Sequence, residues 1–494
     1  MLDIEILDLI KKLQSAKAEA DNIEVKSAKD GCPKRLYDTI SAFSNKSGGI
    51  ILFGIDETDG FSICGVYDAA DLQKKMVEQC NQMIPVVRGV LSTLVYDEKV
   101  ILALEIPEAS YEDKSVYYAG AGMVKGSYIR VGDADLRMTD KEIYSMIAFR
   151  NNIHDELRVA QRAELIDLDM DKVDEFLKKQ VSKRPNFAKL GKERMMEELG
   201  IIAKSDSGDF KPTVAGMLCF GIYPQSIFPQ WCMTCIAVPG FEVGEVTGVK
   251  ERFIDNKRID GTIPEMIEGS IAFLLKNISV KTIIDRKTAK REDKAEYPSN
   301  AIREAILNAL VHRDYSVHSE GIYIQMRMYK NHIEIQNPGG VFGRLSIDEI
   351  GKKKNYDTRN PGLIKILEEM EIIENRGSGI PTMVDEMLSY GLERPEYIDA
   401  RGNFIVTFYG LAEEDGTLNG TLNPNDTLND TLNEVEKRIF EEISKNSKVT
   451  ADDISQTTGI AAITIKRYFS SLQKKGLLVR DGSKKTGHWQ IKNS

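Results

Sequence analysis

The stretch REAILNALVHRDY, from Arg303 to Tyr315, decides how the centre of this chain is interpreted. We expect a helix here, because apolar residues recur at helical spacing on one face: Ile302, Ala305, Ile306, Ala309 and Leu310. Glu304, Asn308 and His312 recur at every fourth position, so they form a polar ridge along the same helix. This pattern predicts a helix that is half buried and carries one ordered polar face.

The polar ridge carries the candidate chemistry. An Asn oxygen is a hard ligand that suits Mg²⁺, whose other partners are waters and phosphate oxygens. A Glu one turn earlier can orient or deprotonate an attacking water. Ser299 and Asn300 follow Pro298 and can cap the start of the helix. The alternative, which this helix alone leaves open, is that its polar residues only face a neighbouring element.

Two glycine segments lie downstream of this helix. IEIQNPGGVFG, Ile333 to Gly343, reads as a strand that runs into a Gly-rich turn, and ENRGSGI, Glu374 to Ile380, as a second Gly turn before a helical pattern. Glycines let backbone N–H groups approach phosphates and form anion-binding nests. Either segment alone is typical of an ordinary turn, whereas the order of helix, strand, Gly turn and second Gly turn is more specific.

This order resembles the GHKL ATPase superfamily of gyrase and the histidine kinases, over about Ala295 to Gly410. More closely, it resembles the divergent GHKL-like domain of bacterial transcriptional regulators. The resemblance implies ATP and Mg²⁺ as cofactors, with Glu304 as the acid and Asn308 as the Mg²⁺ ligand. It also implies two glycine pairs that contact the nucleotide: Gly339 and Gly340, and Gly377 and Gly379.

The chain departs from the GHKL pattern at the position that contacts the adenine base. The family usually has an Asp that accepts from the adenine amino group, and this chain has Asn337, which can both accept and donate. The basic segment Gly351–Asn360 stands where an ATP lid would be, and four of its side chains either contact phosphates or are solvated: Lys352, Lys353, Lys354 and Arg359. The chain has no GxxxxGK[ST] motif, so the sequence gives no support to a P-loop helicase.

Length and composition set the bounds. The 494 residues are enough for about three domains. The net charge of −10 argues against a protein that binds nucleic acid over its whole surface, but it is compatible with one basic module that does so. No apolar run reaches the roughly 18 residues of a membrane-spanning helix, and the amphipathic N-terminus lacks signal-peptide character, so we expect a cytoplasmic protein with no membrane partner. Of six cysteines, Cys232 and Cys235 form a lone CxxC that favours a buried strand over a metal or redox site.

The N-terminal region has an ordered series of motifs that resembles the Schlafen AlbA-type domain, from about Glu19 to Ile147. The series is ExK, A-F-x-N-x-x-G-G, a strand ending in Gly-x-Asp, and Y-I-R-V-G. The resemblance implies an α/β domain that binds nucleic acid. Four basic side chains are candidates for the phosphate backbone: Lys26, Lys46, Lys125 and Arg130.

A nuclease is the alternative for the same domain, because eukaryotic Schlafen proteins carry a version that cleaves structured RNA with three acidic residues. Glu19, Glu24 and Asp56 could hold divalent metal for phosphodiester cleavage, with Lys26 on the scissile phosphate. The alternative without catalysis is that the Glu and Lys side chains form a surface ion pair and the Asp lies in an ordinary turn. The sequence leaves both open.

The C-terminal region begins with a change in composition. Residues 412–433 hold four copies of TLN among Gly, Asn, Asp and Pro, which predicts a flexible linker. Residues 434–494 then read as a winged helix-turn-helix with a turn at Gly459. This segment has nine Lys and three Arg against four Glu and three Asp, a net charge of +5. The candidate DNA contacts are Thr464, Lys466 and Arg467 in the recognition helix and Lys484 and Lys485 in the wing. A protein-interaction winged helix is the alternative.

The whole chain therefore predicts an α+β multidomain protein with a Schlafen AlbA-type α/β domain, a GHKL-like α/β sandwich and a C-terminal winged helix-turn-helix. We expect an AlbA-type domain at 1–150, a helical connector at 151–189, an α+β unit at 190–411, the linker at 412–433 and the winged helix at 434–494. The leading hypothesis is an ATP-binding transcriptional regulator of double-stranded DNA that forms a dimer. The alternatives are a Schlafen-type nuclease acting on RNA or DNA, in phage defence, and an assembly protein with a vestigial ATP site.

Overall fold

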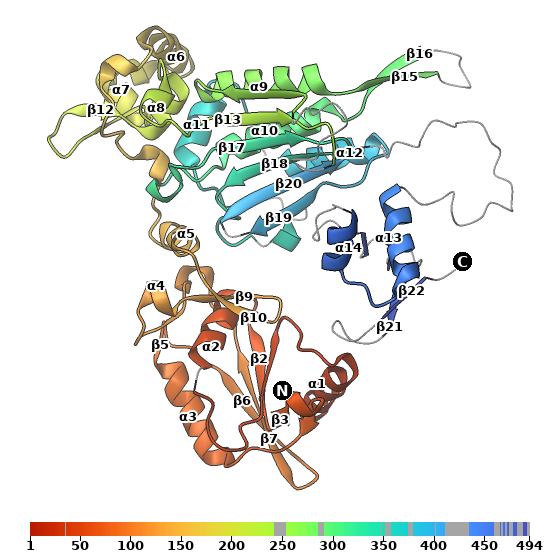
Figure 1. The fold of residues 1–494 in the computed structure, drawn as a ribbon. Helices are drawn as coiled ribbons and strands as arrows, with labels where there is room; N and C mark the ends of the chain where they lie inside the picture. The colour runs from red at the N-terminus through yellow and green to blue at the C-terminus, as the bar shows by residue number, and fades with distance from the viewer. Residues whose placement is uncertain are drawn as a thin grey trace.

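The structure is a computed structural model of the chain, and it is drawn as a ribbon in Figure 1. It describes residues 1–34, 36–241, 253–284, 291–345, 347–350, 357–373, 379–400, 402–410, 434–458, 465, 468–469, 472–473, 478–481 and 488–491. Within these ranges the chain forms an N-terminal α/β domain, a larger central α+β body and a small C-terminal module (Figure 1).

The N-terminal domain is built on a four-stranded sheet in the order β1-β2-β7-β6, in which β1 and β2 are parallel and the other pairs are antiparallel. Its helices are α1 (Asp3–Ala16), α2 (Leu36–Asn45), α3 (Ala69–Asn81), α4 (Met123–Gly126) and α5 (Asp140–Arg150). Its sheet strands are β1 (Ile23–Lys26), β2 (Gly49–Phe53), β6 (Val90–Tyr96) and β7 (Lys99–Ile106). Its shorter strands are β3 (Ile55–Asp56), β4 (Ser62–Ile63), β5 (Met83–Ile84), β8 (Tyr117–Tyr118), β9 (Tyr128–Val131) and β10 (Ala134–Arg137).

Alternating side chains of this sheet enter two separate apolar cores. Leu52 of β2 packs with Ile6 and Ile10 of α1 on one face, whereas Ile51 and Phe53 of the same strand pack with α2 and α3 on the other. Because successive side chains of a strand point to opposite faces, an uninterrupted apolar strand is what a sheet covered on both faces requires. The result is a three-layer domain.

The central body begins with a helical subdomain, drawn in yellow in Figure 1. Its elements are α6 (Met170–Lys183), α7 (Lys192–Glu198), α8 (Val214–Phe220), β11 (Ile202–Lys204) and β12 (Phe210–Pro212). Phe176 of α6 packs against Phe220 of α8 with ring centroids 5.2 Å apart. One continuous apolar core runs from Ala160 to Phe408. The segment expected as a helical connector therefore shares its core with the rest of the body.

A six-stranded sheet in the order β14-β13-β17-β18-β20-β19 forms the second layer of the body, and only the β13–β17 pair is parallel. The strands are β13 (Met233–Ala237), β14 (Asp255–Ile259), β17 (Ile324–Met328), β18 (His332–Pro338), β19 (Glu396–Ala400) and β20 (Asn403–Tyr409). The hairpin of β15 (Val280–Ile284) and β16 (Arg291–Ala295) projects from this body (Figure 1). Cys232 and Cys235 are buried at β13 as free cysteines, as expected of core residues.

Helices cover one face of this sheet. They are α9 (Ile263–Asn277) and α10 (Ser299–Val311), whereas α12 (Gly379–Ser389) packs on α10 and α11 (Pro361–Glu369) packs on α8. α9 packs on β13 and β14, α10 packs on β18, and α10 also contacts both α9 and α12. The expected helix is found as α10, but it begins at Ser299 and ends at Val311, so His312 to Tyr315 lie beyond its end. It lies between α9 and α12 as the central helix of an α/β sandwich.

The C-terminal module contains α13 (Glu434–Lys445), α14 (Ala451–Thr458) and an antiparallel hairpin of β21 (Leu478–Asp481) and β22 (His488–Ile491). Ile465, Phe469 and Leu472 enter its core at helical spacing, next to Trp489 of β22. The expected α+β multidomain fold class is confirmed. No helix in the described part of the chain is long and apolar enough to cross a membrane.

Candidate functional site

The polar ridge of α10 faces the beginning of α12. Asn300 Nδ2 donates to Glu386 Oε1 of α12 at 3.4 Å, which sets the two helices side by side. Two turns further along α10, Asn308 Nδ2 lies 3.4 Å from Glu304 Oε1. A Cβ on Gly379, the first residue of α12, would stand 2.1 Å from Glu304 Oε1 and 3.3 Å from Asn308 Nδ2. The structure therefore brings Glu304, Asn308 and Gly379 together at one point.

Gly379 is needed at this point for its missing side chain. Any Cβ there would displace the Glu304 carboxylate, because 2.1 Å is far inside van der Waals contact. The carboxylate also meets the N-terminus of α12, where free backbone N–H groups favour negative charge. Burial raises the pKa of Glu304, while Arg303 and the Asn308 amide oppose that rise. A carboxyl with a raised pKa is suited to exchange a proton with a bound water.

In the first glycine segment, Asn337 lies on the helix-covered face of β18. Ile333, Ile335 and Asn337 alternate along the strand and are all buried, with Asn337 only 4% exposed. β18 is held between β17 and β20, so its backbone is fixed from both sides. Asn337 Oδ1 is buried and has no hydrogen-bond partner within the described residues. An unpaired buried polar atom is costly, so a donor from a ligand would stabilise it.

Gly339 turns the chain at the end of β18. Its φ of +103° is a conformation that side chains disfavour, and a Cβ would stand 2.9 Å from Asp314 Cβ and 3.1 Å from Asp314 N. Asp314 N donates to Pro338 O at 2.8 Å, which ties the segment to the end of α10. On the next residue, a Cβ of Gly340 would stand 2.4 Å from Asp399 Oδ1 of β19. Only glycines fit between these two aspartates.

Arg359 lies beside the same glycines. Its Nη2 donates to Gly340 O at 3.1 Å, and its guanidinium stands over the Phe342 ring, 4.7 Å from the centroid. The residue is 8% exposed, and its Nε has no hydrogen-bond partner in the part of the chain that the structure describes. A buried cation without a direct carboxylate partner among those residues is suited to an anion.

The charge of Arg359 acts on the neighbouring groups. Burial by itself would raise the pKa of Asp314, but Arg359 and the hydrogen bonds from Ser316 and Ser319 outweigh burial, and the net pKa is lowered. The protein packed around the imidazole of His312 removes water from the ring, and this desolvation, followed by the positive charge of Arg359, lowers its pKa to about 4. Part of the His312 side chain is nevertheless exposed. Asp314 is thus ionised and His312 neutral at pH 7.

Several expected residues lie outside the described residues. They are Gly377 of the second glycine segment and the lid lysines Lys352, Lys353 and Lys354. Conversely, the sequence did not single out Asp314 or Asp399, and it considered Arg359 only as part of a basic loop. The HRD within the opening stretch was the available signal for Asp314. Nothing local signalled Asp399, which the sheet order β18-β20-β19 brings to Gly340.

The residues present fit a nucleotide with Mg²⁺. Asn308 offers a hard oxygen next to a carboxylate, Asn337 an unsatisfied acceptor, and the glycines a close approach of backbone to ligand. The second glycine segment meets α10 at Glu304, and the first meets the turn after α10 at Asp314.

The N-terminal domain holds a second cluster of charged side chains, centred on Arg130 of β9. Arg130 is 2% exposed, and its guanidinium lies 2.9 Å from Glu24 Oε2, 2.9 Å from Asp135 Oδ1 and 3.5 Å from Glu19 Oε2. Burial, and then the charge of Glu24, raise the pKa of Glu19 to about 7. The guanidinium of Arg130, which we expected to contact nucleic acid, is instead buried among three carboxylates.

The expected acidic trio is not brought together. Glu19 and Glu24 share Arg130, but Asp56 accepts hydrogen bonds from Thr58 N and Thr58 Oγ1, at 3.0 and 2.6 Å, as the cap of a short turn. Among the described residues, no group of three or more His, Cys, Asp or Glu side chains is placed to hold a metal ion. Within the part of the chain that the structure describes, the nuclease alternative therefore has no metal centre.

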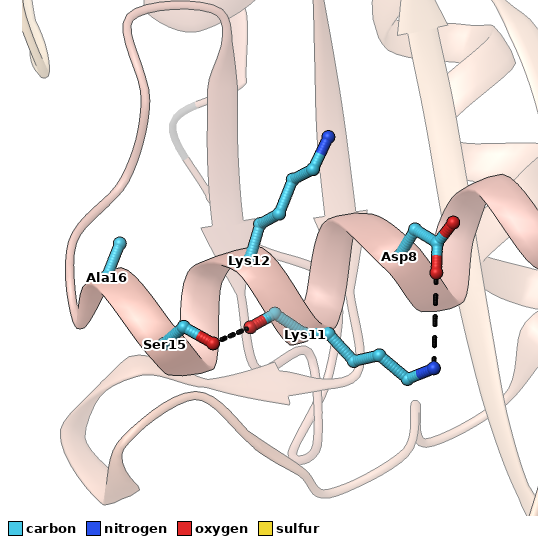
Figure 2. Close-up of a pocket in the computed structure, with 5 residues that line it drawn as sticks. All are labelled: Asp8, Lys11, Lys12, Ser15 and Ala16. Carbon is cyan, nitrogen blue, oxygen red and sulfur yellow. Dashed lines mark hydrogen bonds and ion pairs between the residues drawn. The ribbon is translucent and has the colours of Figure 1, made fainter.

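The remaining candidates for nucleic-acid contact differ in their exposure and in whether the structure describes them. Lys26 is partly exposed and pairs with Glu24, whereas Lys46 and Lys125 are exposed. Thr464, Lys466 and Arg467 of the recognition helix, and Lys484 and Lys485 of the wing, lie outside the described residues. Figure 2 shows a shallow depression along α1, lined by Asp8, Lys11, Lys12, Ser15 and Ala16. It lies on one exposed helix and gathers none of the expected site residues.

Four family models match the chain and define its class. "Schlafen, AlbA_2" matches residues 19–139, and "Putative ATP-dependent DNA helicase recG C-terminal", an ATPase-like family, matches 321–408. "Winged helix-turn-helix DNA-binding" matches 432–479, and a domain of unknown function, DUF8451, matches 144–234. The chain is therefore a multidomain protein with a Schlafen AlbA_2 domain, a RecG-C-terminal-like, ATPase-like domain and a C-terminal winged helix.

Solved structures add two distant likenesses. The DIP2311 protein from Corynebacterium diphtheriae is 15% identical, with a TM-score of 0.39, over 99% of this chain and 97% of that one. The N-terminal domain of a RecG-related putative ATP-dependent DNA helicase from Nitrosomonas europaea is 28% identical, with a TM-score of 0.22, over 27% of this chain and 92% of that one. No curated protein matches the chain in sequence.

Proposed function

We propose that this chain is a DNA-binding transcriptional regulator whose state is set by ATP with Mg²⁺. The observation that carries the proposal is the meeting of Glu304, Asn308 and Gly379 at one end of a site that has Asn337 and Gly339 at the other. The sequence predicted three motifs: the polar ridge of α10 and the two glycine segments. The second glycine segment contacts the ridge directly, and the first lies against Asp314, just after the end of α10.

The roles of the residues follow from their chemistry. Asn308 would hold Mg²⁺, Asn337 would accept from the base, and Arg359 would offer its Nε–H, which has no partner among the described residues, to an anionic group of the ligand. A bound triphosphate supplies the phosphoanhydride and the negative charge. Glu304, with its raised pKa, is the group that would orient a water or take its proton.

The winged helix is the proposed DNA-binding module. Residues 434–494 carry a net charge of +5 in a chain of net charge −10. Positive charge concentrated on one small module is the electrostatic requirement for holding DNA phosphates. We propose that the AlbA_2 domain contributes a further nucleic-acid contact through Lys46 and Lys125, and that a dimer supplies the second half-site. Two half-sites raise affinity by avidity without any new contact.

A thermal-shift experiment tests the nucleotide part of the proposal. Millimolar ATP with Mg²⁺ should raise the melting temperature of the full chain, because a ligand stabilises the state that binds it. Asn308→Ala should abolish that shift. Asn300→Ala is the matched control, since it removes the same amide two turns earlier on the same ridge and should leave the shift intact. No shift with ATP, ADP or GTP would reject the nucleotide site.

The regulator and the assembly alternative differ in what ATP does. A regulator should change its affinity for DNA when ATP binds, and thermodynamic linkage requires DNA to change the affinity for ATP by the same factor. An assembly protein with a vestigial site should show neither effect. Filter binding of labelled DNA with and without ATP–Mg²⁺ distinguishes the two.

A further inference from the structure

We propose that strand β6 of the N-terminal domain pairs in antiparallel orientation with β6 of a second copy of this chain, so that the two four-stranded sheets become one. The inference rests on the dimer of the proposed function, for which it names the surface. It requires neither a bound nucleotide nor DNA.

The outer side of β6 is an unprotected sheet edge. The strand Val90–Tyr96 contains no Pro and no charged residue, and its register with β7 is unbroken along its whole length. Natural edge strands are usually blunted by a Lys, a Pro or a bulge, because free backbone groups invite another strand. β6 has none of these features.

The opposite edge of the same sheet is covered. On β1, Val25 N donates to Glu19 Oε1 at 2.7 Å, and Ile23 O accepts from Arg130 Nη2 at 3.2 Å. In the described part of the chain, the backbone of β6 has hydrogen bonds only with β7. The sheet can therefore be extended at β6 and not at β1.

The turn between β6 and β7 determines which backbone groups are free. Residues 97–98 form a two-residue turn with φ of +51° and +62°, as a type I′ hairpin requires. The residues beside such a turn, Tyr96 and Lys99, form a hydrogen-bonded pair, and bonded and non-bonded pairs then alternate along the ladder. Three residues of β6 consequently direct their N–H and C=O groups away from β7: Leu91, Thr93 and Val95.

A two-fold axis at Thr93 brings these free groups together. Thr93 then faces Thr93 of the second copy, and Leu91 faces Val95 of the second copy. Because all three residues have outward backbone groups, each facing pair exchanges two hydrogen bonds. The same surface is used by both copies, so the contact closes at a dimer and leaves no free edge.

Charges beyond the two ends of β6 favour this register. Arg88 lies five residues before Thr93 and Glu98 lies five residues after it, so the axis sets Arg88 of each copy opposite Glu98 of the other. Both side chains are exposed, and neither has an ion pair within the described residues. An axis at Ser92 or Leu94 would leave Arg88 opposite an uncharged residue, which makes Thr93 the preferred centre.

The exposed apolar side chains of β6 become covered in the same arrangement. Val90, which is 56% exposed, faces Tyr96 of the second copy, which is 47% exposed. Val95, which is 66% exposed, faces the half-buried Leu91. Aromatic and β-branched side chains that face each other across an antiparallel pair are stabilising. Backbone, charge and apolar side chains thus all fit a second copy of the same strand.

Charge reversal on the full chain tests the register. Sedimentation velocity should show the unaltered chain as a dimer at tens of micromolar. Arg88→Glu and Glu98→Arg should each raise the dissociation constant of the dimer by about tenfold or more, because both symmetric pairs become repulsive. An equimolar mixture of the two variants should dimerise again, since each facing pair then has one acid and one base.

Val95→Lys tests the edge itself. The exposed position should tolerate the Lys in the folded domain, and a charge on the edge should leave the chain monomeric. Val131→Lys is the matched control, because Val131 of β9 is 55% exposed and lies on another strand. That variant should remain a dimer, and melting temperatures should show that both variants are folded.

Three outcomes would overturn the inference. They are an unaltered chain that stays monomeric, a dimer that persists in Val95→Lys, and charge-reversal variants that stay apart when they are mixed. The thermal shift with ATP is measured on the same samples. Its absence would reject the nucleotide function and leave the β6 dimer standing, whereas a monomer that shifts with ATP would reject the β6 dimer alone.

Discussion

Phe149 of α5 meets Phe342 of the first glycine segment edge to face, with ring centroids 5.6 Å apart and an angle of 72° between the rings. On its other side, Phe149 packs edge-on against Tyr111 of the N-terminal domain, at 4.8 Å. Phe342 in turn lies beneath the Arg359 guanidinium. A continuous line of aromatic contacts therefore joins the AlbA_2 domain to the candidate nucleotide site.

The first prediction concerns this aromatic pair. A double-mutant cycle with Phe149→Ala and Phe342→Ala should give a coupling of about 0.5–1.5 kcal/mol in the free energy of unfolding, as edge-to-face pairs do. Urea denaturation of the four proteins measures it. The same pair should also transmit nucleotide binding, so Phe149→Ala should reduce any effect of ATP on nucleic-acid affinity. Additive single effects would show that the rings do not interact.

The two glycine segments should respond differently to Ala. Gly339→Ala should destabilise the chain by about 1–3 kcal/mol, because a positive φ and the Asp314 backbone both oppose a side chain. Gly379→Ala meets only the end of the Glu304 side chain and adds a better helix former at the start of α12. It should cost little stability and instead reduce the thermal shift with ATP. Equal losses of stability in the two variants would contradict this account.

Glu156 gives a prediction about pH. The residue is fully buried at the N-terminus of α11, where its Oε1 accepts from Gly362 N at 2.9 Å. Burial, the largest influence, raises its pKa to about 7, and Asp155 adds to the rise. Because the folded state holds the proton more tightly than the unfolded state, the contribution of Glu156 to stability is full below about pH 4.5 and is lost as the pH rises through 7.

Glu156→Gln removes that titration. The Gln oxygen can keep the hydrogen bond from Gly362 N, so the variant should be more stable than the unaltered chain at pH 8, by up to about 3 kcal/mol, and nearly equal to it at pH 5. Urea midpoints at the two pH values give the comparison. A difference that is the same at both pH values would mean that Glu156 does not titrate in this range.

Arg130 gives a prediction about the N-terminal domain. Arg130→Ala leaves three carboxylates without their shared cation, and removing one partner of a buried charge cluster costs about 3–5 kcal/mol. Thermal denaturation should show the loss. Lys125→Ala is the control, because that side chain is exposed and its loss should affect nucleic-acid binding without affecting stability.

Local patterns predicted much of this structure, and tertiary contacts account for the rest. The apolar face and the polar ridge of α10 depend only on residues that are three or four positions apart, so the periodicity of the sequence was enough to predict them. The meeting of Gly379 with Glu304 followed only from a resemblance. The place of Asp399 beside Gly340 depends on the order of strands in the sheet, which no local pattern specifies.

Arg130 illustrates the same limit for charge. As a basic residue in a strand flanked by glycines, it was a reasonable candidate for phosphate contact. The pairing of β9 with β10 sets Asp135 opposite Arg130, and Glu19 and Glu24 reach it from a distant part of the chain. A sequence gives the sign of a charge, but only the folded chain decides whether that charge is already neutralised.

The last prediction concerns DNA. The winged helix has the concentrated positive charge, so affinity for DNA should fall steeply with salt, by about 0.9 logarithmic units per tenfold rise in salt for each phosphate contact. Lys466→Ala or Arg467→Ala should cost about 1–3 kcal/mol of affinity for the preferred sequence if the side chain reads a base. Removal of a side chain that contacts only phosphate should instead weaken binding to all sequences alike and reduce the salt slope by about one.

Truncation after Leu411 should leave a folded body whose melting temperature still rises with ATP but which has lost specific DNA binding. If the truncated body binds DNA as tightly as the full chain, the AlbA_2 domain is the reader, and the winged helix has another partner.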